Sequence, residues 1–296
     1  MQEVMEYRIR SKISDEELQN KVGRIITDDD YNILLTGPTK VVLPNGEPLC
    51  VYLPKAISQE MCAAAFPILK TANGISDTRG LASGSRPTVR LRQQSFRPVP
   101  SSIIGYFDPA SGGRYPFCRQ TAWTGRNTEQ FHNLYPLFES IADLMKQHVP
   151  HRYQAQMERT IRTHPDWRVG NTPYTTFTVN NTYPTGVHQD NGDLEEGFSC
   201  LLCIRRGEYT GGYLSFPEYR IAVNMQDGDL MLMDASRQWH GNTAIVKQSD
   251  DAERVSLVLY YRTKMEFCGS KQEEAEKERL TRMKKIPKPV KGEVNA

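Results

Sequence analysis

Three residues in the second half of the chain have the types and the spacing of a metal site. His188 and Asp190 are separated by one residue, and His240 lies fifty positions after Asp190. In an extended segment residues i and i+2 point to the same side, so His188 and Asp190 converge, while His240 must arrive from a different strand. Two imidazoles and one carboxylate on one face of a metal leave positions open, as non-haem Fe(II) requires to hold a co-substrate and O₂. The sequence therefore predicts an Fe(II) site at these three residues.

A second pair of residues, which begins fourteen positions after His240, predicts a carboxylate-binding site. Arg254 and Ser256 have the same i, i+2 spacing at the start of an apolar run that is typical of a strand. A planar guanidinium binds a carboxylate through two parallel hydrogen bonds, and the serine hydroxyl adds a further donor. We expect this pair to hold the carboxylate of a ligand that reaches the metal.

Together these motifs resemble those of the 2-oxoglutarate- and Fe(II)-dependent dioxygenases. Residues 211–217 are similar to the G-G-x-L-x-F-P strand of that superfamily, and residues 226–230 are similar to its P-G-D turn. The resemblance implies Fe(II), 2-oxoglutarate and O₂ as cofactors, with Arg254 and Ser256 on the far carboxylate of 2-oxoglutarate and Arg119 as a reserve cation. Each motif alone is common by chance. The resemblance depends on all of the motifs occurring together and in this order along the chain.

Several further segments resemble the TET/JBP branch of this superfamily, particularly its bacteriophage-type members. They are residues 79–84, 105–108, 115–123, 188–193 and 234–242. The resemblance implies hydroxylation of the 5-methyl group of a pyrimidine in DNA, either thymine or 5-methylcytosine. The cysteine-rich, zinc-binding region of the vertebrate members is missing, so no zinc is expected.

A methyl group inside a duplex is out of reach of a buried metal, so the nucleotide must be flipped out or come from a single strand. Trp123, Tyr213 and Trp239 are the candidates to line the pocket that would receive the base. Each of these aromatic side chains could instead belong to the core.

Two other functions remain open at this stage. A prolyl-hydroxylase-like oxygenase of a protein or amino acid shares the G-G-x-L-x-F-P and R-x-S patterns. A cupin-like binding module without turnover would share the fold. Succinate formation that depends on iron separates an oxygenase from a binding module, and stimulation by DNA or by peptide separates the two oxygenases.

The composition predicts one large globular domain. The chain has 296 residues, 38% of them hydrophobic, and a formal charge of +2. We expect a mainly β fold with flanking helices (α+β) around a double-stranded β-helix core, which is related to the jelly roll and the cupin barrel. Residues 1–74 would form an N-terminal hairpin and helix extension, residues 75–265 the dioxygenase domain, and residues 266–296 a charged helix and basic tail.

Local patterns place the elements of this fold. Asn45-Gly46 between two apolar runs predicts a hairpin, and Ser58 is the expected cap of a helix. The 3.6-residue spacing of apolar side chains, together with charge, predicts helices over 58–71, 128–149, 152–163 and 272–285. Strands are expected over 174–180, 198–204, 212–216, 230–233 and 255–261.

The nearly neutral net charge hides a basic and an acidic half. Residues 61–130 contain nine basic and three acidic side chains, whereas residues 188–254 contain six basic and twelve acidic ones. Arginines interleaved with aromatic residues suit a phosphate backbone and stacked bases, so Arg90, Arg92 and Arg97 are candidates for DNA contacts, together with the basic tail from Lys284 to Lys291. The alternative is that these arginines solvate loops and pair with the acidic residues.

The cysteines and the chain start point to an intracellular protein. Six cysteines without a secretory signal predict reduced thiols, and Cys200 and Cys203 are expected in the core, because a spacing of three on a strand puts their sulfurs on opposite faces. No apolar run is long enough to cross a bilayer. We expect a soluble protein of the cytoplasm, or of the host cytoplasm if the source is viral.

Overall fold

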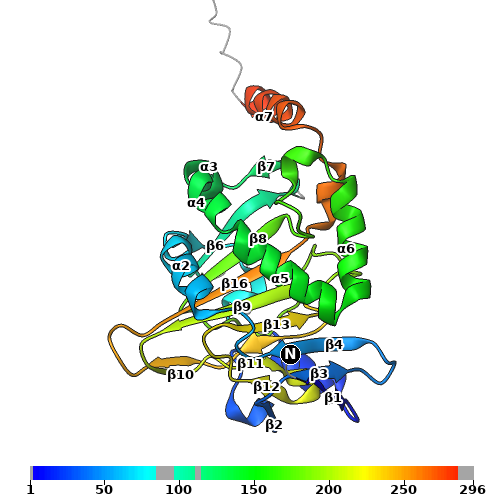
Figure 1. The fold of residues 1–296 in the computed structure, drawn as a ribbon, viewed down its shortest axis with the longest axis vertical. Coiled ribbons are helices and arrows are strands. Elements are labelled where there is room, and N and C mark those ends of the chain that lie inside the picture. Colours follow the sequence, from blue (N-terminus) through cyan, green and yellow to red (C-terminus); the bar gives the residue numbers. More distant parts are fainter. Residues whose placement is uncertain (1–2, 85–96, 111–114, 286–296) are drawn as a thin grey trace, which may run out of the picture.

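The computed structural model describes residues 3–84, 97–110 and 115–285. Ten strands form the larger sheet, in the order β1-β3-β4-β13-β9-β16-β8-β6-β5, with β7 paired to β6 (Figure 1). A smaller sheet has the order β14-β11-β12-β2, and β10 and β15 form a separate ribbon. Two sheets that pack face to face, with helices outside, make up the double-stranded β-helix architecture that the sequence predicts.

The strands of the larger sheet follow in chain order: β1 Met5–Arg8, β3 Thr39–Val42, β4 Pro48–Leu53, β5 Ile75–Ser76, β6 Val99–Phe107, β7 Arg119–Gln120, β8 Thr176–Asn181, β9 Ser199–Arg206, β13 Asp229–Met233 and β16 Glu253–Tyr260. The smaller sheet contains β2 Ile33–Leu35, β11 Leu214–Phe216, β12 Ile221–Val223 and β14 Gly241–Asn242. The ribbon consists of β10 Tyr209–Gly211 and β15 Ile245–Lys247.

Residues 1–74, expected as an extension, contribute strands to both sheets. β3 and β4 form the predicted antiparallel hairpin, and Gly46 in its turn has φ +86°, a left-handed conformation that favours glycine. β4 pairs with β13, while β2 pairs in parallel with β12. The N-terminal segment therefore packs as part of the same folded unit.

The central strand β9 shows how the larger sheet divides the core into two layers. Cys200, Leu202 and Ile204 pack in one cluster of buried apolar residues, while Leu201 and Cys203 pack in a second cluster together with residues of the smaller sheet. Alternation of side chains along a strand produces this division. The prediction that Cys200 and Cys203 are core residues on opposite faces is confirmed.

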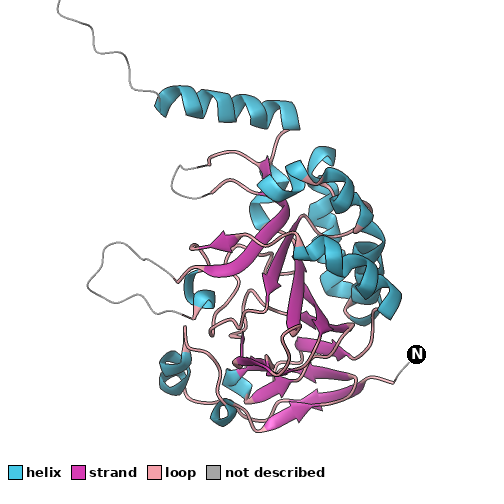
Figure 2. Cartoon of the chain, turned by 90° about the vertical axis from the view of Figure 1, so that its left-hand side faces the viewer, coloured by secondary structure: helices cyan, strands magenta, loops and turns pink. Residues whose placement is uncertain are grey.

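The helices cover the face of the larger sheet that carries Cys200, as Figure 2 shows. They are α1 Asp15–Lys21, α2 Gln59–Lys70, α3 Ala122–Arg126, α4 Thr128–Asn133, α5 Tyr135–His148, α6 Pro150–Arg162 and α7 Lys271–Lys285, of which α1 and α7 lie away from this face. Five 3₁₀ turns complete the described elements: η1 Asp28–Asp30, η2 Gly80–Ser83, η3 Pro165–Trp167, η4 Pro217–Tyr219 and η5 Thr263–Phe267. None of these described helices has the length and apolarity needed to cross a membrane.

Two of the helix predictions can be compared in detail. Ser58 caps α2, because its hydroxyl accepts a hydrogen bond from the amide of Met61 at 3.2 Å. The single helix expected over 128–149 is two helices, α4 and α5, which meet at Leu134. Pro136 lies in the first turn of α5, and since it has no N–H to donate to the preceding turn, the helix restarts there.

The expectation that all cysteines are reduced is wrong for one pair. Cys118 and Cys268 form a disulfide with their Cα atoms 5.8 Å apart, while the other four cysteines are free and buried. The Glu274 carboxylate accepts hydrogen bonds from the Cys118 amide at 2.7 Å and the Gly269 amide at 2.9 Å, so it joins the two sides of the bridge. A separation of 150 residues along the chain gives no local signal of this pairing.

Candidate metal centre

The two histidines are held opposite each other by the backbone. His188 and His240 form an isolated antiparallel bridge, in which the amide of each donates to the carbonyl of the other, at 2.9 Å and 3.0 Å. Directly opposed residues of an antiparallel pair project to the same face. Their ring centroids consequently lie only 4.4 Å apart, although fifty-two residues separate them in the chain.

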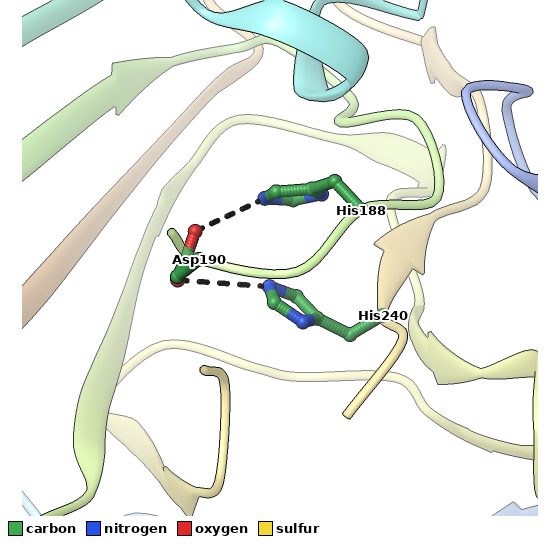
Figure 3. Close-up of side chains that lie close together, drawn as sticks. All are labelled: His188, Asp190 and His240. Atoms are coloured by element: carbon green, nitrogen blue, oxygen red, sulfur yellow. Dashed lines mark ion pairs between the residues drawn. The ribbon is translucent and has the colours of Figure 1, made fainter. Parts of the chain in front are cut away.

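Asp190 completes the group from the same loop as His188. Its amide donates to the carbonyl of Ala235 at 2.9 Å, and this bond fixes the loop beside the His240 segment. The carboxylate oxygens lie 3.3 Å from His188 Nε2 and 3.8 Å from His240 Nε2 (Figure 3). All three potential ligand atoms fall within 4.8 Å of one another, which is close enough for them to share one ion.

The Nδ1 atoms of both imidazoles are hydrogen-bonded to backbone carbonyl groups. His188 Nδ1 lies 2.8 Å from the carbonyl oxygen of Gly186, and His240 Nδ1 lies 3.0 Å from that of Gln238. Since a carbonyl only accepts, each Nδ1 carries the proton and each Nε2 offers its lone pair toward Asp190. This donor set fits a divalent cation with three protein ligands.

The charges around the three side chains favour metal-binding protonation states. Burial, helped by the nearby His188, lowers the pKa of His240 to about 4, so its imidazole is neutral at ordinary pH. For Asp190, burial would raise the pKa, but the neighbouring imidazoles of His188 and His240 outweigh burial and lower it to about 2. A neutral imidazole and an ionised carboxylate are the forms that ligate a cation.

Arg254 and Ser256 lie on the cavity side of β16, since the intervening Val255 packs in the helix-side cluster. Both residues are 2% exposed, and Ser256 lines the cavity that contains His188 and His240. Nη2 of Arg254 is buried without a hydrogen-bond partner among the described residues. A buried charged donor without a partner is costly, so this position suits a carboxylate supplied by a ligand.

Gly212, from the G-G-x-L-x-F-P motif, makes room for Arg254. It has φ +71°, and a Cβ built on it would lie 3.4 Å from Cδ and 3.5 Å from Nε of Arg254. The motif and the R-x-S pair therefore meet in space.

The cavity in front of the metal ligands has a volume of about 360 Å³, within the range of small-molecule sites. Further polar and charged residues that the sequence analysis did not assign to the site also line it. Among them are Arg79, Tyr183, Asp193 and Arg262. On the β16 side the lining continues from Ser256 through Val258, Tyr260 and Arg262, which are alternate positions of one strand and its continuation.

Arg262 is held in an ion network at the end of this row. Its Nε lies 3.1 Å from the Asp108 carboxylate, and its Nη1 lies 2.8 Å from the Asn191 carbonyl and 3.7 Å from the Asp193 carboxylate. The guanidinium also lies over the ring of Phe107, at 4.9 Å from the centroid. The i, i+2 spacing that indicated Arg254 and Ser256 would have indicated Arg262 if it had been continued to the end of the strand.

The other candidate residues from the sequence are only partly brought together. Trp239 lines the cavity, whereas Trp123, Tyr213 and Arg119 are not among its described lining residues. The indole of Trp123 is buried in the helix-side core and donates to Thr71 at 3.1 Å. Tyr213 lies beside Tyr31, with 6.1 Å between the ring centroids.

Arg119, the reserve cation, has other partners in the structure. Its guanidinium stacks over Tyr115 at 4.5 Å, and it donates to the Asp108 carbonyl at 3.3 Å. The sequence shows that Trp123, Tyr213 and Arg119 are close to the motifs along the chain. It does not show toward which face each side chain points. Of the DNA-contact candidates, Arg97 is exposed at the start of the segment that leads into β6, and Arg90 and Arg92 lie outside the described residues.

The fold and the cavity define an oxygenase domain of the kind that uses Fe(II), 2-oxoglutarate and O₂. Residues 102–263 match the Tet_JBP family, described as the oxygenase domain of the 2OGFeDO superfamily, and the chain belongs to this family. The chain is 29% identical to the bifunctional helicase and thymine dioxygenase JBP2 of Trypanosoma brucei brucei, over 89% of this chain and 23% of the relative. It is 30% identical to the thymine dioxygenase JBP1 of Leishmania braziliensis, over 74% of this chain and 25% of the relative.

These relatives are much longer proteins, since the chain spans only about a quarter of each. Among solved structures, NgTET1 in complex with 5mC DNA has a TM-score of 0.60 at 16% identity, over 90% of this chain and all of that one. This likeness confirms the predicted fold.

Proposed function

We propose that this protein is an Fe(II)- and 2-oxoglutarate-dependent dioxygenase that hydroxylates the 5-methyl group of a pyrimidine base in DNA. The observation that carries the proposal is Nη2 of Arg254, which is buried without a partner among the described residues, on the same strand face as Ser256, which lines the cavity that holds His188, Asp190 and His240. The relatives named thymine dioxygenases support a methylpyrimidine as the substrate. We further propose that the protein works inside the cell, where its DNA substrate would lie.

In this proposal each residue has a defined role. His188, Asp190 and His240 hold Fe(II), and Arg254 with Ser256 binds the far carboxylate of 2-oxoglutarate. When bound, the iron supplies, with 2-oxoglutarate and O₂, the oxidation of a C–H bond. The Gly186 and Gln238 carbonyls keep the two imidazoles in the orientation that ligation needs.

The cavity residues place the base. A volume of about 360 Å³ admits a single nucleotide base, so a base paired within a duplex would have to leave the stack to enter. Trp239, Tyr260 and Arg262 line the walls that such a base would meet. Arg97, together with Arg90 and Arg92, is proposed to contact the DNA backbone outside the cavity.

The experiment that tests the proposal is mass spectrometry of digested nucleosides after incubation of the protein with Fe(II), 2-oxoglutarate and DNA. Parallel substrates contain thymine alone or thymine with 5-methylcytosine, and a proline-containing peptide is the comparison. A 5-hydroxymethylpyrimidine formed together with succinate is the expected result. Succinate formation stimulated by the peptide, with unmodified DNA, would instead establish a prolyl-hydroxylase-like enzyme.

The control variant must remove a charge without touching the site. Arg162 lies on α6, on the helix-covered side of the larger sheet, and is not among the described residues that line the cavity; its ion pair with Glu266 is long at 3.8 Å. Arg162→Gln should therefore retain the activity of the wild type. His240→Ala should form neither succinate nor modified base.

A further inference from the structure

One wall of the cavity comes from a short segment that the metal site does not use. Thr78, Arg79 and the first residues of η2 line the cavity opposite β16. Tyr183, from the loop that leads to His188, donates its hydroxyl to the carbonyl of Ala82 in η2. The segment 78–84 is therefore attached to the loop that carries the metal ligands.

Glycine contacts hold this segment against the metal loop. A Cβ built on Gly186 would lie 2.8 Å from the Leu81 carbonyl oxygen and 2.9 Å from the Gly84 Cα, so the two backbones touch where Gly186 has no side chain. The Gly186 amide also donates to the carbonyl of Ala82 at 3.1 Å. Since the Gly186 carbonyl accepts from His188, the wall segment and the metal ligand share one anchoring residue.

Gly241 extends this contact to the second histidine. A Cβ on Gly241 would lie 3.1 Å from the carbonyl carbon of Gly186, and Gly241 directly follows His240. Three backbone segments are thus layered at Gly84, Gly186 and Gly241. The position of Arg79 is consequently fixed with respect to both imidazoles.

Arg79 lines the cavity together with Tyr183 and Tyr260, and its charge acts on both of these side chains. Burial raises the pKa of Tyr260 to about 12, and the charge of Arg79 opposes this rise. Burial likewise raises the pKa of Tyr183 to about 12, again opposed by Arg79. Tyr260 is six positions beyond Arg254 on the same face of one strand, about 20 Å along it.

The acidic groups at this end already have other partners. Asp108 and Asp193 pair with Arg262, and Asp190 faces the two histidines. Within residues 3–84, 97–110 and 115–285, Arg79 makes no hydrogen bond or ion pair, and it acts on Asp190 only through its charge, which is the smallest of the effects that lower the pKa of that carboxyl. A half-exposed guanidinium that lines a cavity, on a backbone segment held against the metal loop, is suited to an anionic group of the incoming ligand.

We propose that Arg79 binds a backbone phosphate next to the nucleotide that enters the cavity. The inference rests on the proposed function, because it takes the ligand to be DNA. A nucleotide turned into a pocket carries its flanking phosphates to the pocket mouth, and the guanidinium offers two donors to such a phosphate. Arg79 is a substrate-binding residue that fixes how far the base enters.

The test combines a protein variant with a modified DNA. Arg79→Gln removes the charge, and a methylphosphonate next to the target methylpyrimidine removes the phosphate charge at one position. Wild-type protein should bind the modified DNA about tenfold more weakly than unmodified DNA, because one charge-assisted contact is lost. Arg79→Gln should bind both DNAs equally, at the weaker affinity.

Two further readouts keep the interpretation specific. The slope of log affinity against log salt should fall by about 0.9 in Arg79→Gln, which corresponds to one phosphate contact, and Arg79→Lys should restore most of that slope. Arg162→Gln is the matched control and should retain the wild-type slope. The affinity for 2-oxoglutarate in anaerobic titration should be the same for all four proteins.

The failures of this inference and of the proposed function are distinguishable. If Arg79→Gln loses 2-oxoglutarate affinity but keeps the salt slope, Arg79 binds the co-substrate and the inference is overturned. Equal sensitivity of wild type and variant to methylphosphonate overturns it as well, with hydroxylation of DNA intact. If no DNA is bound or hydroxylated by the wild type, the proposed function itself fails.

Discussion

Replacing Arg254 by lysine tests the co-substrate site directly. Arg254 is 2% exposed and has a buried Nη2 without a described partner, so the protein itself does not use this donor. A lysine keeps the charge but cannot form two parallel hydrogen bonds with a carboxylate. The loss of one charge-assisted bond costs about 1.5–3 kcal/mol, so 2-oxoglutarate should bind roughly tenfold to over a hundredfold more weakly.

The same structure predicts what should not change. Since Nη2 of Arg254 makes no described bond within the protein, the melting temperature without co-substrate should stay close to that of the wild type. When 2-oxoglutarate is added during thermal unfolding, the gain in stability should depend on the ratio of its concentration to its dissociation constant. The curve of the variant should therefore be displaced to higher concentration by the same factor as its dissociation constant.

Arg205→Lys provides a matched control for this experiment. Arg205 lies directly across from Arg254 on the neighbouring strand β9, but its guanidinium donates to the carbonyls of Met225 and Tyr209 within the protein. Its replacement should leave the 2-oxoglutarate dependence unchanged. An unaltered requirement for 2-oxoglutarate in Arg254→Lys would refute the assignment, and another cation would have to bind the far carboxylate.

Three more outcomes are expected. His188→Ala, Asp190→Ala and His240→Ala should each abolish turnover and tight Fe(II) binding with a native circular dichroism spectrum, and activity in any one of them would remove that residue from the ligand set. Gly186→Ala should displace segment 78–84, since the new Cβ would meet the Leu81 carbonyl at 2.8 Å; we expect a raised KM for DNA and more succinate per hydroxylated base, while Gly125→Ala, with its nearest contact at 3.8 Å, should match the wild type. Burial raises the pKa of Asp30, but hydrogen bonds from Lys21 at 2.6 Å and Thr27 at 2.7 Å more than offset this and lower it, so its folded-state pKa lies below the unfolded value. That stability is present above about pH 4 and is lost as pH falls through the folded pKa, so urea unfolding of Asp30→Asn should show a deficit at pH 7 that disappears in acid.

His188 and Asp190 could be grouped from the sequence as candidate metal ligands because their geometry is local. One intervening residue in an extended segment puts His188 and Asp190 on one side, and the same rule applies to Arg254 and Ser256. The partner His240 could be predicted as a residue type, but not its hydrogen-bonded pairing with His188. That pairing depends on how two distant loops are aligned.

The side chains that the structure places away from the cavity and the unexpected disulfide share a physical cause. Trp123 and Arg119 are near the motifs in the chain, yet the direction of each side chain depends on the helix or strand that carries it. The Cys118–Cys268 disulfide and the glycine layer at Gly84, Gly186 and Gly241 depend on contacts between segments that are far apart in sequence. No local pattern encodes such contacts.

In the proposed function, β16 and its continuation carry the contacts to co-substrate and to substrate on one face. Arg254 and Ser256 lie toward one end of a row of alternate positions, and Tyr260 and Arg262 lie toward its other end. Because a strand rises about 7 Å for every two residues, the number of residues between these positions sets the distance between the proposed co-substrate and substrate sites. Substitutions at positions 260 and 262 can alter the choice of base while the co-substrate end stays intact. An insertion or deletion of a single residue between positions 256 and 260 would instead turn one end of the row away from the cavity and uncouple the two.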